Sequence, residues 1–568
     1  MRHVDLFQLI EQKKRVYLLI VVFIIIFFAL IYRLFQIQVV EGSKLTELAR
    51  KEHILSYTLD GKRGVIFDRN LKKLAVNVDT KSLFAMPYKI DNSEQIAKIL
   101  SEKTDAGYSE VINQLEKEKY FVWLRRKLPQ SSYNEIKELD IEGIDFVTES
   151  TRYYPKEQLA ANLLGFVGID NQGLEGLEMY FDGKLKSISG LVVMERDASG
   201  SKIPLSIEKM LPSKDGNSIV LTIDEVIQYV TEEALEKACL QYNPKSAVAI
   251  VVRPETGEIL SLAVQPTYNL NNFQLVPKEY WKNRAITDNY EPGSTFKIFT
   301  IATALENNYA SLNDSFNCKG WIKYHGTVIR DIDPHGKQDL TDIVKNSCNV
   351  GLIEVGIRMD ENIFAESIRN FGFGAETGVN MPGETPGLFR PVDQWSKISI
   401  ASLSIGQEIS VTPLQLVMAT ASIANNGILM KPLIVKEIID PDYNIVEQFN
   451  PVQVRKVISS DTANTMMNIL QEVVDDGTGI RGKLDSYTAA GKTGTSQKFD
   501  FSLGRYSNEK FTSWFVGFAP SHDAEIAVIV MLDEPKGSYY GGTVAAPVFQ
   551  EIASKVLPYL SIPPEKNK

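Results

Sequence analysis

Three short motifs in the second half of the chain contain residue types that can perform nucleophilic catalysis. Ser294 and Lys297 form an S-x-x-K motif, Ser347 and Asn349 form an S-x-N motif, and Lys492 opens the one K-T-G of the sequence. A serine hydroxyl is a weak nucleophile at neutral pH, so an adjacent base must take its proton. A lysine can be that base when burial lowers its pKa, because desolvation disfavours the charged amine.

The surroundings of Ser294 distinguish it from the other serines that have a lysine three residues later. The same motif begins at Ser199, Ser206 and Ser507, in linker or loop segments where an ordinary surface hydroxyl is expected. Ser294 instead follows the turn residues Glu-Pro-Gly and begins the run FKIFTIATAL, which predicts a buried helix. Side chains three residues apart share a helix face, so Lys297 is expected beside Ser294. The helix N-terminus would direct backbone N–H groups at a developing oxyanion.

The K-T-G segment is expected on an edge strand that lines a cleft. Three strand-like runs, YTAAGKTGTS, FTSWFVGFAP and EIAVIVMLD, lie near the end of the chain. A glycine in a strand lets another backbone approach closely, which would be the role of Gly494 toward a ligand. Lys492, Thr493 and Thr495 can hold a substrate carboxylate through an amine and two hydroxyls.

The elements around these motifs predict an α+β domain. VLTID is a strand or turn, DEVIQYVTEEALEKACLQY a helix, and SAVAIVVRP and EILSLAVQP two strands. Helical segments such as TPLQLVMATASIANNG fill the middle, and the three strand-like runs follow them. A sheet whose strands come from both ends of the segment, with a helical insertion between them, is typical of this class.

The preceding part of the chain has a different pattern. RGVIFDRN followed by KKLAVNV is typical of a hairpin with Asp68-Arg69-Asn70 at its turn. Between 93 and 145, apolar residues at helical spacing predict small amphipathic helices. Six glycines between 152 and 190 indicate turns and loops. The turn cluster at 212–217 is where we place a domain boundary.

One apolar segment predicts a membrane anchor. Val16 to Tyr32 is a run of 17 apolar or aromatic residues without a charge. As a helix it would measure about 26 Å, close to the thickness of a bilayer core. A cleaved signal peptide is the alternative, but no small-x-small cleavage site follows. The basic triplet at 13–15 favours a cytoplasmic N-terminus, with the large remainder outside the cytoplasm.

Composition excludes several other classes of protein. The content of 44% hydrophobic residues excludes a wholly disordered chain. The sequence has 61 Lys and Arg residues and 71 Asp and Glu residues, which gives a net charge of −10. Nucleic acid is therefore not an expected partner, because its binding requires clustered positive charge. Three cysteines are too few for a disulfide scaffold. The five histidines are scattered without metal-ligand spacing, so no metal site is expected.

The anchor and the ordered motifs make the chain similar to the class B penicillin-binding proteins, the monofunctional D,D-transpeptidases of peptidoglycan synthesis. The resemblance covers nearly the whole chain. Its N-terminal motifs are RGVIFDR at 63–69, RYYP at 152–155, GFVG at 165–168 and GLEGLE at 173–178. Its later motifs are SIGQ at 404–407, VTPLQ at 411–415, IANNG at 423–427 and WFVG at 514–517.

This resemblance implies the domain plan. It consists of a single N-terminal transmembrane helix, an elongated β-rich pedestal domain, and a transpeptidase domain with an antiparallel sheet flanked by helices plus a helical subdomain. No cofactor is implied. We place a cytoplasmic tail at 1–15, the transmembrane anchor at 16–36, the pedestal or dimerisation-type domain at 41–215, the transpeptidase domain at 216–558 and a tail at 559–568.

The resemblance also implies a role for each residue of the first two motifs. Ser294 would form the acyl-enzyme and Lys297 would be its general base. Ser347 would relay a proton, and Asn349 would bind the peptide amide of the substrate. Between them stands Cys348, where septal enzymes usually carry serine. Its thiol is expected to pack into the helical subdomain, since free cysteine behaves as a small hydrophobe.

The K-T-G strand would bind the substrate. Lys492 and Thr493 would hold the terminal carboxylate or polarise the site, with Gly494 between the two threonines. The backbone N–H groups of Ser294 and Thr495 would form the oxyanion hole.

Partners and location follow from the same resemblance. Expected partners are the D-Ala-D-Ala stem peptide, β-lactams, the cytoplasmic (inner) membrane through 16–36, and a polytopic glycosyltransferase with other division proteins. IRDID at 329–333 and NVG at 349–351 resemble the septal, division-type branch, and the elongation type is the alternative. A catalytically silent division scaffold is the alternative without an enzyme. A class A β-lactamase is disfavoured because the sequence has no E-x-x-L-N.

Overall fold

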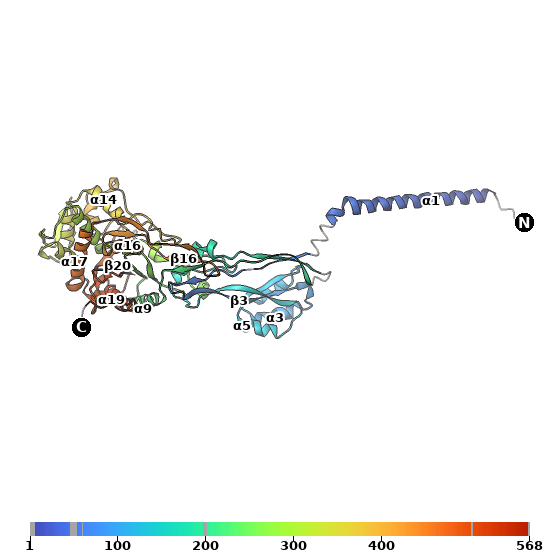
Figure 1. Ribbon diagram of the computed structural model, residues 1–568, viewed down its shortest axis with the longest axis horizontal. Coiled ribbons are helices and arrows are strands. Elements are labelled where there is room, and N and C mark those ends of the chain that lie inside the picture. Colours follow the sequence, from blue (N-terminus) through green and yellow to red (C-terminus); the bar gives the residue numbers. More distant parts are fainter. Residues whose placement is uncertain (1–5, 46–53, 60, 197–201, 501–503, 566–568) are drawn as a thin grey trace. The chain divides into compact units, whose positions relative to one another are not determined.

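A computed structural model describes residues 6–45, 54–59, 61–196, 202–500 and 504–565 (Figure 1). The chain divides into two compact units. The first comprises Met1–Gly61 and Ile188–Lys214, and the second comprises Lys62–Ser187 and Asp215–Lys568. All three catalytic motifs lie in the second unit.

The first unit contains the apolar helix and a small sheet. Helix α1 (Leu6–Phe35) continues into the π-helix η1 (Gln36–Val40). The stretch Ile10–Val40, which includes the expected anchor, is long and apolar enough to cross a membrane. An antiparallel sheet in the order β1-β6-β7 completes the unit, formed by β1 (Ile54–Leu59), β6 (Gly190–Arg196) and β7 (Lys202–Leu211).

The second unit begins with the hairpin that the sequence predicts. Strand β2 pairs antiparallel with β3, and the Asp68 carboxylate closes the turn by accepting hydrogen bonds from the N–H groups of Asn70 and Lys72, each 2.8 Å long. Its second oxygen accepts a bond of 3.1 Å from the N–H of Glu225, the first residue of α9. The bounds are β2 (Ile66–Phe67), β3 (Lys73–Ala85) and α9 (Glu225–Tyr242).

The segment 93–145 contains the three predicted helices and also a strand that was not predicted. Strand β4, with the sequence VWLRRKL, pairs with β3 at the edge of the sheet. Its three consecutive basic residues hide the period of two that marks a half-buried strand. Strand β5 pairs with β3 over ten residues. The bounds are α3 (Ser93–Lys103), α4 (Tyr108–Leu115), β4 (Val122–Leu128), α5 (Gln130–Lys137) and β5 (Ile144–Tyr153).

One sheet of this unit combines strands from distant parts of the sequence. Its order is β17-β16-β8-β2-β3-β4, and β5 also pairs with β3. Strand β8 (Ser218–Leu221) is parallel to β2 and antiparallel to β16 (Val435–Ile439). The segment that follows the expected pedestal therefore contributes strands to the pedestal's own sheet. The remaining strand is β17 (Ile445–Gln448).

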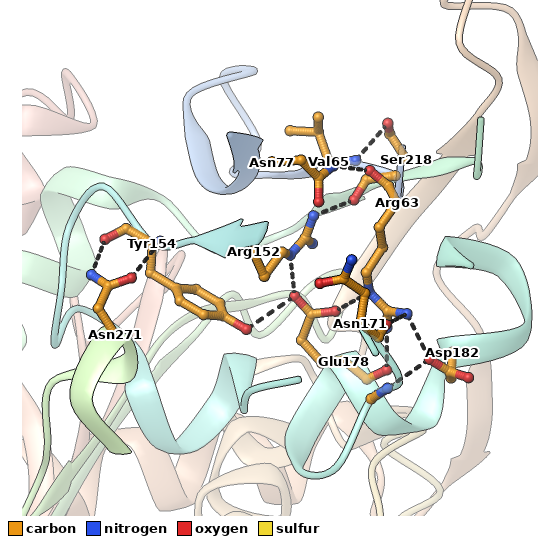
Figure 2. Close-up of polar contacts among 12 residues, drawn as sticks. Arg63, Val65, Asn77, Arg152, Tyr154, Asn171, Glu178, Asp182, Ser218 and Asn271 are labelled. Atoms are coloured by element: carbon orange, nitrogen blue, oxygen red, sulfur yellow. Dashed lines mark hydrogen bonds and ion pairs between the residues drawn. The ribbon is translucent and has the colours of Figure 1, made fainter. Parts of the chain in front are cut away.

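The glycine-rich segment forms more than turns and loops, because three short helices occupy it: α6 (Ala161–Leu164), α7 (Gly176–Tyr180) and α8 (Asp182–Leu185). Helix α7 carries Glu178, whose fully buried carboxylate accepts bonds of 2.7 Å from Arg63 Nε and 2.6 Å from Arg152 Nε (Figure 2). The hydroxyl of Tyr154 donates to the same carboxylate at 3.3 Å, and Asp182 accepts from Arg63 Nη1 at 2.6 Å. Three motifs of the N-terminal half thus meet in one buried ion-pair network.

The central sheet is antiparallel and takes its strands from both ends of the domain, as predicted. The structure shows their order to be β10-β9-β21-β20-β19. Alternate side chains of β9 face opposite layers: Val248 and Ile250 belong to the core that includes α16, whereas Ala249 and Val251 pack in the core that includes α9 and α19. The α+β class is confirmed. The bounds are β9 (Ser246–Val252), β10 (Ile259–Gln265), α16 (Pro413–Ala424), β19 (Ala490–Asp500), β20 (Arg505–Ala519), β21 (Ile526–Asp533) and α19 (Ala546–Tyr559).

A mainly helical insertion lies between β10 and β19 in the sequence and carries the first two motifs. Besides α16, its longer helices are α11 (Lys297–Glu306), α12 (Leu340–Lys345), α13 (Asn349–Gly356), α14 (Glu361–Asn370), α15 (Ser399–Ser404) and α17 (Ser460–Asp476). Short strands between α11 and α12 are β11 (Phe316–Cys318), β12 (Trp321–Tyr324), β13 (Thr327–Arg330) and β14 (Gly336–Gln338). The predicted pattern of a sheet plus a helical insertion is confirmed.

Candidate active site

A cleft of about 670 Å³ brings the three motifs together. Its wall includes Ser294, Ser347 and Asn349 from the first two motifs, with Thr493, Gly494 and Thr495 from the K-T-G strand. The other two predicted site residues, Lys297 and Lys492, are fully buried behind this wall. All eight predicted residues therefore lie in or directly behind one cleft.

Ser294 lies on a tight turn at the start of the buried helix. The 3-10 turn η5 (Gly293–Phe296) leads directly into α11. Gly293 adopts a left-handed backbone with φ of +54°, and a Cβ added there would lie 3.1 Å from the Cβ of Ser496. A glycine at this position thus lets the turn pack directly on the K-T-G strand and presents Ser294 at the cleft.

The amine of Lys297 is the best-connected group of the site. It donates hydrogen bonds of 2.6 Å to the carbonyl oxygen of Ser347, 3.2 Å to the Ser347 hydroxyl and 2.8 Å to Asn349 Oδ1. Burial lowers the pKa of Lys297 to about 8, although the nearby charge of Asp331 favours the protonated amine. Lys297 can consequently exchange a proton near neutral pH.

The S-x-N segment owes its shape to a strained residue and a helix start. Ser347 has a left-handed backbone, with φ of +57°, a conformation that non-glycine residues seldom adopt outside functional sites. Asn349 follows as the first residue of α13, with Cys348 as the N-cap. The thiol of Cys348 is fully buried in the core, as expected from the sequence, and its sulfur accepts a hydrogen bond of 3.3 Å from the N–H of Gly351.

The K-T-G segment lies on β19, at the edge of the five-stranded sheet. The amine of Lys492 points behind the strand and donates to the carbonyl of Thr493 at 3.2 Å. Burial, with a smaller contribution from the charge of Lys297, holds the pKa of Lys492 well below its usual value. The Thr493 hydroxyl bonds to that of Thr478 at 3.0 Å, and the Thr495 hydroxyl accepts from the N–H of Gly541 at 3.1 Å.

A glycine at position 494 is needed for a structural reason besides the close approach of a ligand. A Cβ at this position would lie 2.8 Å from Thr295 Cγ2 and 3.0 Å from the carbonyl oxygen of Pro292. Real Cβ atoms essentially never come that close to a neighbouring heavy atom. The absent side chain therefore lets the turn that carries Ser294 lie against the K-T-G strand.

Several residues of the cleft were not predicted. Turn segments outside the three motifs supply them, and the sequence offers only glycine clusters, at 476–479 and 539–542, as a signal for such turns. Gln407, from the SIGQ motif, was quoted for the resemblance but given no place in the site. The additional residues of the wall include Gln407, Thr478, Arg481, Tyr539, Tyr540 and Thr543.

Comparison with protein families covers most of the chain. Residues 247–554 match the penicillin-binding protein transpeptidase domain, and residues 58–221 match the penicillin-binding protein dimerisation domain. The chain is a class B penicillin-binding protein. The resemblance inferred from its motifs is confirmed.

This class B penicillin-binding protein has similar relatives along its full length. Stage V sporulation protein D of Bacillus subtilis is 37% identical over 98% of this chain and 88% of that protein. The peptidoglycan D,D-transpeptidase FtsI of Escherichia coli is 32% identical over 94% of this chain and 90% of that protein.

Solved structures agree with the fold. Penicillin-binding protein 3 of Mycobacterium tuberculosis, in complex with aztreonam, has a TM-score of 0.71 and 27% identity over 90% of this chain and 98% of that one. A peptidoglycan synthetase from Bifidobacterium adolescentis has a TM-score of 0.73 and 25% identity over 91% of this chain and 98% of that one. The transpeptidase domain is that of a serine acyltransferase family.

Proposed function

We propose that this class B penicillin-binding protein cross-links peptidoglycan stem peptides through an acyl-enzyme on Ser294. The observation that supports this most directly is the amine of Lys297, which is buried, has a pKa of about 8, and is held by the S-x-N segment behind the cleft. Relatives named as peptidoglycan D,D-transpeptidases, such as FtsI, support the reaction class.

Acylation would begin with proton transfer from Ser294 to Lys297. The serine oxygen attacks the carbonyl carbon between the two D-alanines, so that a C–O bond forms as the C–N bond breaks. The proton returns through Ser347 to the leaving amine of the terminal D-alanine. Backbone N–H groups of Ser294 and Thr495 stabilise the oxyanion, since donors fixed in place need no reorganisation during the reaction.

Transfer would complete the cycle. An amine of a second stem peptide attacks the ester carbonyl and gives up a proton to Lys297, and an amide bond forms as the ester C–O bond to Ser294 breaks. Lys297 then returns that proton to the Ser294 oxygen, which regenerates the hydroxyl. Asn349 binds the peptide amide of the donor, and the hydroxyls of Thr493 and Thr495 hold the carboxylate. Lys492 lies buried behind this strand, where the neutral amine is favoured, so it would polarise the site rather than bind the carboxylate as an ammonium group.

β-Lactams would acylate Ser294 by the same reaction. Their ring amide takes the place of the D-alanyl-D-alanine bond, and ring opening leaves the antibiotic attached to Ser294.

Within the family we favour a septal role, on the motifs at 329–333 and 349–351 and the similarity to FtsI, with an elongation-type role as the alternative.

Location would follow from the apolar helix. Residues 16–36 would cross the cytoplasmic membrane with the N-terminus inside, and the catalytic domain would lie outside. A polytopic glycosyltransferase and other division proteins are the proposed partners. Tyr32, Arg33 and Gln36 form a chain of hydrogen bonds of 3.1 and 3.2 Å near the end of the helix, and such a polar group in lipid favours a helix partner.

Intact-mass analysis with penicillin tests the proposed acyl-enzyme. The wild-type chain should gain one adduct, and Ser294→Ala should gain none. Ser507→Ala is the matched control, because Ser507 also has a lysine three residues later but lies outside the cleft. An unchanged adduct on Ser294→Ala would reject the nucleophile, and a wild-type chain that never labels would favour a silent division scaffold.

A further inference from the structure

Four potential metal ligands converge beside the active-site cleft. Donor atoms of Cys318, Asp331, His335 and Cys348 all lie within 4.8 Å of one another. Cys318 ends β11, and its antiparallel pairing with Gly336 of β14 brings the adjacent His335 near it. Asp331 follows β13, and Cys348 caps α13. The ligands come from four points of the fold, which explains why their sequence spacing indicated no site.

Both sulfur atoms are buried at the cluster and accept backbone hydrogen bonds. Cys318 is 2% exposed and Cys348 is fully buried. The sulfur of Cys318 accepts a hydrogen bond of 3.4 Å from the N–H of Gly320, and that of Cys348 accepts one of 3.3 Å from the N–H of Gly351. Backbone N–H groups directed at sulfur stabilise negative charge on it, as they do around cysteine-bound metal centres.

The carboxylate of Asp331 faces the same point. Its side chain is only 2% exposed, and Oδ2 accepts hydrogen bonds of 2.7 and 3.2 Å from the N–H groups of Asn349 and Val350. Among the described residues, no lysine or arginine forms an ion pair with it. Oδ1 also accepts a hydrogen bond of 3.0 Å from the N–H of Ile332, and the Cys318 sulfur lies 3.5 Å from Oδ2. An anionic carboxylate this deeply buried beside two sulfurs is a group that a bound cation would stabilise.

The imidazole of His335 supplies an independent indication. Its Nδ1 lies 3.8 Å from Asp331 Oδ2, is itself buried, and has no hydrogen-bond partner within the described part of the chain. Buried polar atoms almost always have a partner, so an unpartnered nitrogen aimed into a cluster of thiols and a carboxylate requires an explanation. Its side chain is 21% exposed, so His335 is the most solvent-accessible of the four residues.

We propose that Cys318, Asp331, His335 and Cys348 bind one zinc ion. Two sulfurs, one imidazole nitrogen and one carboxylate oxygen are a donor set that Zn²⁺ accepts, and four protein ligands are typical of a structural rather than a catalytic zinc. Harder ions such as Mg²⁺ and Ca²⁺ are disfavoured, because they prefer oxygen ligands. This geometry replaces the expectation, drawn from histidine spacing, that the chain has no metal site.

The zinc would stabilise the S-x-N segment. Cys348 stands between Ser347 and Asn349, which hold the amine of Lys297, and Asp331 accepts the N–H of Asn349. An ion that fixes Cys348 and Asp331 would thus fix the partners of the proposed base. This consequence rests on the proposed function, whereas zinc binding itself does not.

Metal analysis tests the site directly. The full-length chain is purified in detergent under reducing, chelator-free conditions and equilibrated with micromolar zinc. After unbound metal is removed, the zinc that remains bound is measured by elemental mass spectrometry. About one zinc per chain is expected. Cys318→Ser and His335→Ala should each weaken zinc binding by at least about tenfold in competition with a chromophoric chelator.

Matched controls come from the same residue types elsewhere. Cys239→Ser, on α9, and His325→Ala, at an exposed hairpin tip, should retain the zinc of the wild-type chain. His335 is the partly exposed ligand, so His335→Ala remains informative if Cys318→Ser fails to fold. A wild-type chain that retains no zinc, or full retention by both ligand variants, would overturn the proposal.

Thiol alkylation gives a second, activity-independent measurement. Because both thiols are already buried, alkylation is measured at a urea concentration that exposes them in the zinc-free chain. Zinc should slow alkylation of Cys318 and Cys348 there and leave Cys239 unaffected, and chelation should remove that protection. Equal modification of the two cysteines with and without zinc would contradict the site.

The rate of penicillin acylation tests whether bound zinc stabilises the S-x-N segment, separately from whether zinc binds. Zinc removal should slow acylation by about tenfold or more, and readdition of zinc should restore the rate. Acylation that is unchanged in a chain proven to lose its zinc would reject the stabilising role. A chain that binds zinc as expected but never reacts with penicillin would reject the proposed function and leave the metal site standing.

Discussion

Lys297 and Lys492 are both fully buried amines, yet they differ in what surrounds them. Lys297 donates to three oxygens of the S-x-N segment, whereas Lys492 donates to one backbone carbonyl of its own strand. The first arrangement retains a proton that can be exchanged near neutral pH, and the second favours the neutral amine. Lys297 lies three residues from Ser294 and contacts the Ser347 hydroxyl, whereas Lys492 is bound to its own strand. We therefore infer from position that Lys297 is the base that activates Ser294.

The pKa of Lys297 leads to a prediction about pH. Only the neutral amine can accept the serine proton, and at pH 7 a group with a pKa of about 8 is neutral in about a tenth of the molecules. The rate constant of penicillin acylation should rise about tenfold per pH unit below pH 8 and level off above it. Stopped-flow fluorescence with a labelled penicillin measures this profile. A rate that is flat between pH 6 and 9 would mean that another group takes the proton.

Removal of the same amine should slow acylation without unfolding the protein. Loss of a general base typically costs about 10²–10⁴-fold in rate, so Lys297→Ala should fall in this range. Lys498→Ala is the matched control, because Lys498 lies on the K-T-G strand but pairs with Asp533 away from the cleft. Circular dichroism should be unchanged in both variants. A rate for Lys297→Ala within threefold of wild type would disprove its role.

The residue types of the site could be predicted, but their contacts could not. The order of S-x-x-K, S-x-N and K-T-G, an apolar helix after Ser294 and the resemblance to class B penicillin-binding proteins together predicted the eight residues that the cleft brings together. The packing of Gly494 against the turn of Ser294 was not predictable, because it depends on the separation of two segments 200 residues apart. The convergence of Cys318 and His335 likewise depends on how β11 pairs with β14.

At the scale of elements, the strength of the apolar pattern decided which predictions were confirmed. Strands β9 and β21 are buried on both faces and appear in the sequence as continuous apolar runs. Strand β4 was missed because it lies at a sheet edge and is rich in basic residues. Loops of the cleft carry no periodic signal, so residues such as Thr478 and Tyr540 were found only in the structure.

The contact between the K-T-G strand and the Ser294 turn leads to a prediction at this scale. A Cβ at Gly494 would push against Thr295 and Pro292, so Gly494→Ala should displace the nucleophile. A displacement of about 1 Å can cost up to about 100-fold in rate. Gly183→Ala is the control, because a Cβ there meets no atom within 4 Å. Penicillin acylation rates of the two variants give the comparison, and equal rates would show that the strand yields without moving the serine.

At the scale of the whole second unit, the network around Glu178 holds together segments that are far apart in the sequence. Its two arginines are almost completely buried, with side-chain exposures of 2% for Arg63 and 1% for Arg152. Loss of one member of a buried ion pair leaves an uncompensated charge in the interior, which costs far more than the loss of an exposed pair.

Glu178→Ala should therefore destabilise the fold by about 3–5 kcal/mol. Glu135→Ala, which removes an exposed ion pair with Lys103, should leave the stability almost unchanged, because solvent screens such a pair. Thermal unfolding of both variants in detergent tests this contrast. Similar transition temperatures for Glu178→Ala and the wild-type chain would show that the network adds little to stability.

The pairing of β8 has a practical consequence for anyone who wishes to produce the catalytic part alone. Strand β8 lies between β2 and β16, so a shortened chain that starts near residue 216 would keep β8 and β16 but lose β2. One side of β8 would then present unpaired N–H and C=O groups, and an open strand edge invites association with a second copy. A shortened form that retains β2 and β3 would keep that edge covered and remain the better choice for crystallisation or inhibitor screening.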